Sequence, residues 1–152
     1  MPIFLLPLVA AALRIASLLT LATAAASDID RRIISNRTAL LMFSIGVDLR
    51  FLINPHGLAP SVFAAAAVYL GLVGLTHLKL LGAGDVKLIA AASFYVPANE
   101  VPTLLLDIAI AGGIVCVGFF VERGNLRDRA PVPYGVAIVA ATAYRILSEL
   151  SS

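Results

Sequence analysis

Three aspartates stand where two apolar stretches of the chain end or begin. Asp85 follows two glycines in the segment LLGAGDVKLIA (residues 80–90), and Asp28 and Asp30 follow the first long apolar run. Two carboxyl groups can hydrolyse a peptide, because the ionised one takes a proton from water while the protonated one donates to the carbonyl oxygen under attack. If they lie close together in a low-dielectric site, repulsion raises one pKa and the pair shares a proton. The residue types therefore allow an aspartyl hydrolase, provided that the fold joins Asp85 to an earlier acid.

The residues around Asp85 fit two interpretations. Gly82 and Gly84 carry no Cβ atom, so the backbone can leave helical geometry and a neighbouring helix or an extended substrate strand can approach closely. Alternatively, GAG is a tight connection and Asp85 caps the N-terminus of the next helix. The residues alone leave both open. Lys87 lies about 200° around a helix from Asp85, so we expect it to face away from the aspartate, toward the membrane interface.

The composition places the chain in a bilayer. Of 152 residues, 61% are apolar and 13% charged, and the mean hydropathy is +0.99, whereas soluble domains are about 45 to 50% apolar. Cys116 is the single cysteine, so an intramolecular disulfide and a CxxC metal site are ruled out. We expect no metal and no cofactor. The net charge of +2 is spread over short loops, which indicates membrane topology and argues against a nucleic-acid partner.

The apolar pattern predicts an all-α, polytopic membrane bundle of about six transmembrane helices, formed by residues 1–152 as a single domain. The predicted segments are residues 3–26, 38–53, 58–78, 86–96, 103–121 and 133–150. Crossing the hydrocarbon core takes about 20 helical residues, so residues 86–96 are too short and are expected as an interior or re-entrant, broken helix after the GAGD segment. The run ATAAAS near residue 26 resembles a signal-peptidase site. However, a basic region does not precede the apolar run, so we expect a retained helix.

The loop charges predict the orientation. Lysines and arginines lie in the first, third and fifth loops, including the polar loop 122–133, whereas the second and fourth loops have none. By the positive-inside rule the odd loops are cytoplasmic and both termini are outside. Asp85 and the pair Asp28 and Asp30 then share the cytoplasmic face, although 57 residues separate position 28 from position 85. Residues two apart on a helix point in different directions, so one of Asp28 and Asp30 faces the bundle, and spacing does not choose between them.

The residues that could do chemistry also carry a family resemblance. GAGDVKL (residues 82–88) resembles the GxGD signature of the type IV prepilin peptidases, which are membrane aspartic proteases. In that family an aspartate is followed six to eight residues later by Ile or Leu, Pro, and Asn or Asp. DIDRRIISN (residues 28–36) is similar, with Ile34 and Asn36 in place and Ser35 at the usual proline position. The resemblance continues into VPYGVAI (residues 132–138).

The resemblance implies a function and a set of site residues. It selects Asp28 as the first catalytic carboxylate and Asp85 as the second, with Gly82, Gly84, Asn36 and Lys87 as motif or positioning residues. It implies cleavage of the basic leader of prepilins or pseudopilins at the cytoplasmic face of the bacterial inner membrane, in contact with lipid. The short chain resembles the compact subgroup associated with Flp or tight-adherence pili. It has no room for the cysteine-bearing insertion of longer relatives, so methyltransferase activity is not expected.

Two other function classes compete with the peptidase. A small ion- or proton-coupled transporter also uses intramembrane acids and broken helices, but it typically has a pair of corresponding breaks, and the sequence has one GxG break. A non-enzymatic assembly protein of a secretion machine is the third alternative, and the intact acids argue against it. Arg14 lies in the middle of the first apolar segment, where a charge is costly, and the sequence names no partner for it.

Overall fold

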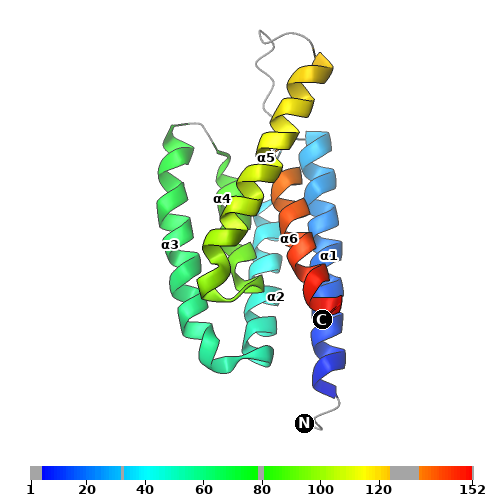
Figure 1. The fold of residues 1–152 in the computed structure, drawn as a ribbon, viewed down its shortest axis with the longest axis vertical. Helices are drawn as coiled ribbons and strands as arrows, with labels where there is room; N and C mark the ends of the chain where they lie inside the picture. The colour runs from blue at the N-terminus through cyan, green and yellow to red at the C-terminus, as the bar shows by residue number, and fades with distance from the viewer. Residues whose placement is uncertain (1–4, 32, 79–80, 124–133, 152) are drawn as a thin grey trace.

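The computed structural model describes residues 5–31, 33–78, 81–123 and 134–151, and these form a helical bundle (Figure 1). The described residues contain no strand. Their α-helices are α1 (Leu5–Arg31), α2 (Asn36–Ile53), α3 (Leu58–His77), α4 (Ala83–Ala92), α5 (Val101–Arg123) and α6 (Tyr134–Ser151). Short 3-10 turns, η1 (Pro55–Gly57), η2 (Ser93–Tyr95) and η3 (Ala98–Glu100), join some of them. The predicted all-α fold is confirmed. The topology charges Arg32, Lys79, Arg127 and Arg129 lie outside the described residues.

Three helical stretches are long and apolar enough to cross a membrane: Leu5–Arg31, Pro55–His77 and Ala98–Gly118. They correspond to the first, third and fifth predicted segments. A helical membrane bundle is therefore consistent with the structure, whereas the orientation of the bundle and the single-domain organisation stay predictions.

Local sequence explains where α1 and α2 end. α1 continues past position 26 to Arg31, so both early aspartates lie on a helix. α2 ends at Ile53, as the following Asn54-Pro55 pair predicts, because proline disfavours helix in the residue before it. Ser35 is the N-cap of α2, where its Oγ accepts a hydrogen bond from the backbone N–H of Arg37 at 3.2 Å. A serine can therefore start this helix in place of proline.

α4 is the short interior helix that the sequence predicts. It begins at Ala83, a few residues before the predicted segment, ends at Ala92 and passes directly into η2. Most of its side chains beyond Asp85 are buried, because α2, α3 and α6 all pack against it. At 10 residues it spans about 15 Å, roughly half of a hydrocarbon core.

The order of the helices places one set of helix ends together. α1 packs against α2 and α6, α5 packs against α6, and α3 packs mainly against α4. The C-terminal end of α1 and the N-terminal ends of α2, α4 and α6 lie at one end of the bundle, at the top of Figure 1. The start of α1 and the end of α6 lie toward the opposite end. The first loop and the start of α4 are therefore neighbours in space.

Polar side chains also join the helices farther along the bundle, away from this end. Tyr95 donates from its hydroxyl group to the backbone oxygen of Met42 at 3.0 Å, and its hydroxyl oxygen lies 2.9 Å from Ser17 Oγ, so it bridges α1 and α2. The guanidinium group of Arg14, for which the sequence named no partner, lies 3.0 Å from Glu149 of α6. The intramembrane arginine thus has a structural role, since a partner on a neighbouring helix offsets part of the cost of a buried charge.

Candidate active site

The two early aspartates of α1 point in opposite directions. Asp28 is buried, with 5% of its surface exposed. Asp30 has 82% of its side chain exposed, and its carboxylate lies 3.9 Å from the guanidinium group of Arg31. Two residues span about 200° of a helix, so only one of the pair can face the bundle. The fold therefore turns Asp28 inward, and Asp28 is the residue that the family resemblance selects.

Asp85 occupies the first turn of α4 and caps it. The backbone N–H of Gly82 donates to Asp85 Oδ2 at 3.1 Å, so the carboxylate satisfies one of the amide groups that the helix leaves without an internal partner. This contact is the one expected if GAG is a tight connection and Asp85 caps the N-terminus of the next helix. Capping and catalysis are compatible, because the contact holds one oxygen of Asp85 in a fixed place at the end of the helix.

The surroundings of Asp85 favour its protonated form. The residue precedes the apolar segment 86–96, and its pKa is raised from 3.8 to about 6. Burial is the largest cause, since it disfavours the charged form. The hydrogen bond from Gly82 acts in the opposite direction, and the negative charge of Asp28 raises the pKa further. The two carboxyl groups therefore interact electrostatically, although they come from different helices.

Two glycines and Ile34 bring the carboxyl groups into one site. A Cβ atom on Gly135 of α6 would lie 2.7 Å from Asp28 Oδ2 and 2.8 Å from Ile34 Cδ1. A Cβ atom on Gly84 of α4 would lie 2.8 Å from the backbone oxygen of Ile34. A Cβ atom at such distances forces its neighbour to move. The side-chain ends beside Gly135 can do so more cheaply than the backbone oxygen beside Gly84. Ile34 of the first loop thus packs against α4 next to Asp85 and against α6 at the glycine that Asp28 also contacts.

Sequence reasoning missed two contributors from α6. Gly135 leaves the space that the Asp28 carboxylate occupies, and Tyr134 packs against Gly112 of α5 within electrostatic range of Asp85. Both belong to the segment VPYGVAI that carries part of the resemblance. That segment could have drawn attention to them, but nothing in its spacing indicates contact with residues more than 40 positions away.

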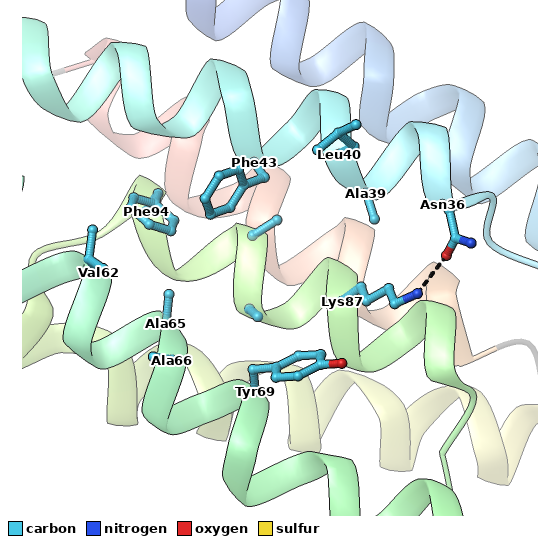
Figure 2. A pocket seen from close by; sticks show the side chains of 12 residues that line it. Asn36, Ala39, Leu40, Phe43, Val62, Ala65, Ala66, Tyr69, Lys87 and Phe94 are labelled. Atoms are coloured by element: carbon cyan, nitrogen blue, oxygen red, sulfur yellow. Dashed lines mark hydrogen bonds between the residues drawn. The ribbon is translucent and has the colours of Figure 1, made fainter.

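Lys87 and Asn36 meet on another side of α4. Lys87 Nζ donates to Asn36 Oδ1 at 2.8 Å, which joins α4 to the start of α2 (Figure 2). The structure gives Lys87 a protein partner because α2 begins beside the first turns of α4. Its place at the membrane interface stays a prediction.

The arrangement can carry out acid–base hydrolysis. A buried carboxyl group and a second one that holds its proton up to about pH 6 share one end of the bundle. One can accept a proton from water while the other donates one. Among the described residues, groups of three or more histidine, cysteine or acidic side chains that could hold a metal are absent.

A comparison with known families agrees with this chemistry. Residues 15–117, more than half of the chain, match the family model described as the type IV leader peptidase family. The matched region includes Asp28 and Asp85 and ends within α5, so Tyr134 and Gly135 lie outside it. Neither a curated protein nor a solved structure matches the chain.

Proposed function

Because the chain belongs to the type IV leader peptidase family, we propose that it is an aspartic endopeptidase that removes the basic leader of prepilins or pseudopilins. The proposed site of cleavage is the cytoplasmic face of the inner membrane, and the substrate is the main partner. One observation carries the proposal. Asp28 and Asp85, from α1 and α4, meet at the same end of the bundle, close enough for the charge of Asp28 to raise the pKa of Asp85.

The proposed reaction uses one proton shared by the two carboxyl groups. The ionised carboxylate takes a proton from water, and the water oxygen attacks the carbonyl carbon of the scissile peptide bond. The protonated carboxyl group donates to the carbonyl oxygen. The carbon–nitrogen bond then breaks, and the new amine takes up the proton that came from water. One hydroxyl group of the tetrahedral intermediate returns its proton to the other carboxylate as the new carboxyl group forms. The proton belongs to the pair as a whole, because strongly interacting acids titrate together.

The geometry also bears on how substrate reaches the pair. Asp28 is 5% exposed, whereas Asp85 is only half-buried at the end of α4. Asp85 is therefore the carboxyl group that substrate meets first. The adjoining Gly82 is exposed and has no side chain, so an extended peptide can lie close to the backbone there. An extended peptide offers its carbonyl group to attack, whereas a regular helix hides it.

The test is leader cleavage by purified protein in detergent, with a prepilin as substrate and mass spectrometry of the shortened product. Asp28→Asn and Asp85→Asn keep the size of each side chain and remove its acid–base function. We expect a loss of at least about 10²-fold, the lower limit for general acid–base catalysis. Asp30→Asn is the matched control and should cleave at the wild-type rate, because Asp30 faces solvent. Wild-type cleavage by Asp28→Asn or Asp85→Asn would refute the assignment.

A further inference from the structure

A groove with a volume of 510 Å³ lies between α2, α3 and α4 (Figure 2). Each wall has lining residues at positions i, i+3, i+4 and i+7. These run from Asn36 to Phe43 in α2, from Val62 to Tyr69 in α3, and from Lys87 of α4 to Phe94 of the adjoining η2. That spacing is one face of a helix. Three helix faces therefore turn toward a common space, which is the arrangement that a fourth helix completes.

The surface of the groove suits a helix. Its lining includes five alanines, which are Ala39, Ala65, Ala66, Ala90 and Ala91. In membranes, helices associate through small residues, because these let two backbones approach closely. A lipid tail gains nothing from such a surface, since it fits equally well among larger apolar side chains. The alanines therefore favour a helical occupant over a lipid tail.

The walls of the groove are apolar and uncovered. Leu40 of α2 is 65% exposed, Phe43 is 43% exposed, and Val62 of α3 is 47% exposed. α3 contacts α4 far more than it contacts α2, so the space between α2 and α3 is left open. In a membrane bundle such a surface faces lipid or another helix, and the small residues of this groove favour a helix.

The two ends of the groove differ. At one end, the hydrogen bond between Lys87 and Asn36 forms a polar boundary, two residues along α4 from Asp85. At the other end, the rings of Phe43 and Phe94 meet edge to face, with centroids 5.1 Å apart (Figure 2). The seven-residue stripes correspond to about 10 Å of helix, or two turns. The groove therefore extends from the candidate active site toward the middle of the bundle.

We propose that this groove binds the first turns of the apolar helix that follows the leader of the substrate. The proposal rests on the proposed function and on the resemblance, which implies that the scissile bond of a prepilin lies just before an apolar helix. Seated in the groove, that helix points its N-terminal end at Lys87. The chain before it then crosses the exposed Gly82 at the start of α4 and reaches Asp85 within about three extended residues. Lys87 gives one of its three donors to Asn36, which leaves two for the carbonyl groups of the crossing chain.

Two neighbouring alanines of α3 provide a matched test. Ala66 and Ala67 are both exposed, but only Ala66 lines the groove. Ala66→Phe places a ring in the groove without entering the core, whereas Ala67→Phe adds the same ring outside it. With a full-length prepilin we expect Ala66→Phe to raise KM at least about tenfold with little change in kcat, because only substrate binding is affected. Ala67→Phe should match the wild type in both constants.

A crosslinking experiment keeps the test independent of folding defects. The photoreactive residue benzoylphenylalanine replaces one of two exposed aromatic residues of α3 in the inactive Asp85→Asn variant, which is then mixed with the prepilin and irradiated. Tyr69 already fills part of the groove lining, whereas Phe63 does not line the groove. We expect a crosslink to the apolar segment of the prepilin from position 69 and none from position 63. Wild-type KM for Ala66→Phe, or crosslinks from position 69 to lipid alone, would overturn the groove proposal. Absence of cleavage by the wild-type protein would instead overturn the proposed function.

Discussion

Gly135 offers a sharp test of how the Asp28 carboxylate is held. It lies in the first turn of α6, and alanine there would place its Cβ atom 2.7 Å from Asp28 Oδ2. Ordinary contacts begin at 3.4 Å, so the carboxylate or the helix must move by about 0.7 Å, the difference between the two distances. The other atom in the way, Ile34 Cδ1, is the end of a side chain that can rotate. The carboxylate is also a side-chain end, so it gives way before the backbone does.

We expect Gly135→Ala to slow leader cleavage and to leave the free energy of unfolding nearly unchanged. A displacement of about 1 Å in a reacting group can cost about 10²-fold in rate. We therefore expect Gly135→Ala to lower the rate of leader cleavage by about 10²-fold, equal to about 2.7 kcal/mol of transition-state stabilisation. Alanine is the better helix former by about 0.5 to 1 kcal/mol in a helix interior, so the free energy of unfolding should not fall by more than the small cost of moving two side-chain ends.

The measurement compares two glycine variants in the same cleavage assay. Gly113→Ala is the matched control, because its new Cβ atom in α5 would meet nothing within 4 Å. It should cleave at the wild-type rate, and thermal unfolding in detergent should be similar for both variants. If Gly135→Ala cleaves as fast as Gly113→Ala, then the position of Asp28 does not limit the reaction and the reasoning fails. A large loss of stability in Gly135→Ala alone would show that the backbone of α6 moves instead.

Two further predictions follow from the site and from the bundle. The pKa of Asp85 is raised to about 6, so the shared proton is lost as the pH rises through that value, and kcat/KM should fall about tenfold per unit at higher pH. The Asp30→Asn variant should show the same dependence of kcat/KM on pH. A kcat/KM that stays constant between about pH 6 and 9 would contradict the shared proton. Tyr95→Phe removes the hydroxyl group that contacts Met42 and Ser17, so it should lower the free energy of unfolding by about 1 kcal/mol. Its cleavage rate should be unchanged, because Ser17 lies about 16 Å along α1 from the catalytic end, and slower cleavage at equal stability would disagree with a purely structural role.

Much of the bundle follows from local sequence. Asn54-Pro55 ends α2 because proline restricts the residue before it, and the structure ends the helix at Ile53. The shortness of the segment after Asp85 predicted an interior helix, since ten residues cannot cross the hydrocarbon core, and α4 is indeed packed on several sides. The predicted first apolar segment ends at position 26, and the helix that contains it continues to Arg31.

Contacts between distant segments could not be read from the sequence. The partner of Arg14 is Glu149, from the far end of the chain, and the neighbour of Asp28 is Gly135 of the last helix. The resemblance marked Asn36 and Lys87 as motif residues, but their hydrogen bond depends on where α2 begins relative to α4. Helical periodicity gives the direction of a side chain about its own axis, and it does not say which helix lies in that direction.

By itself the sequence determined that this is an apolar, all-α protein with acids at two helix ends, because composition and 3.6-residue periodicity are local properties. It also determined that Asp28 and Asp30 cannot both face the bundle, since two residues turn a helix by about 200°. Only the tertiary structure showed that Asp28 is the buried aspartate of the pair. It also showed that Ile34 packs between Gly84 and Gly135, and that α2, α3 and α4 leave a groove. The reason is that these features depend on the relative rotation and depth of whole helices, which many packing contacts set together.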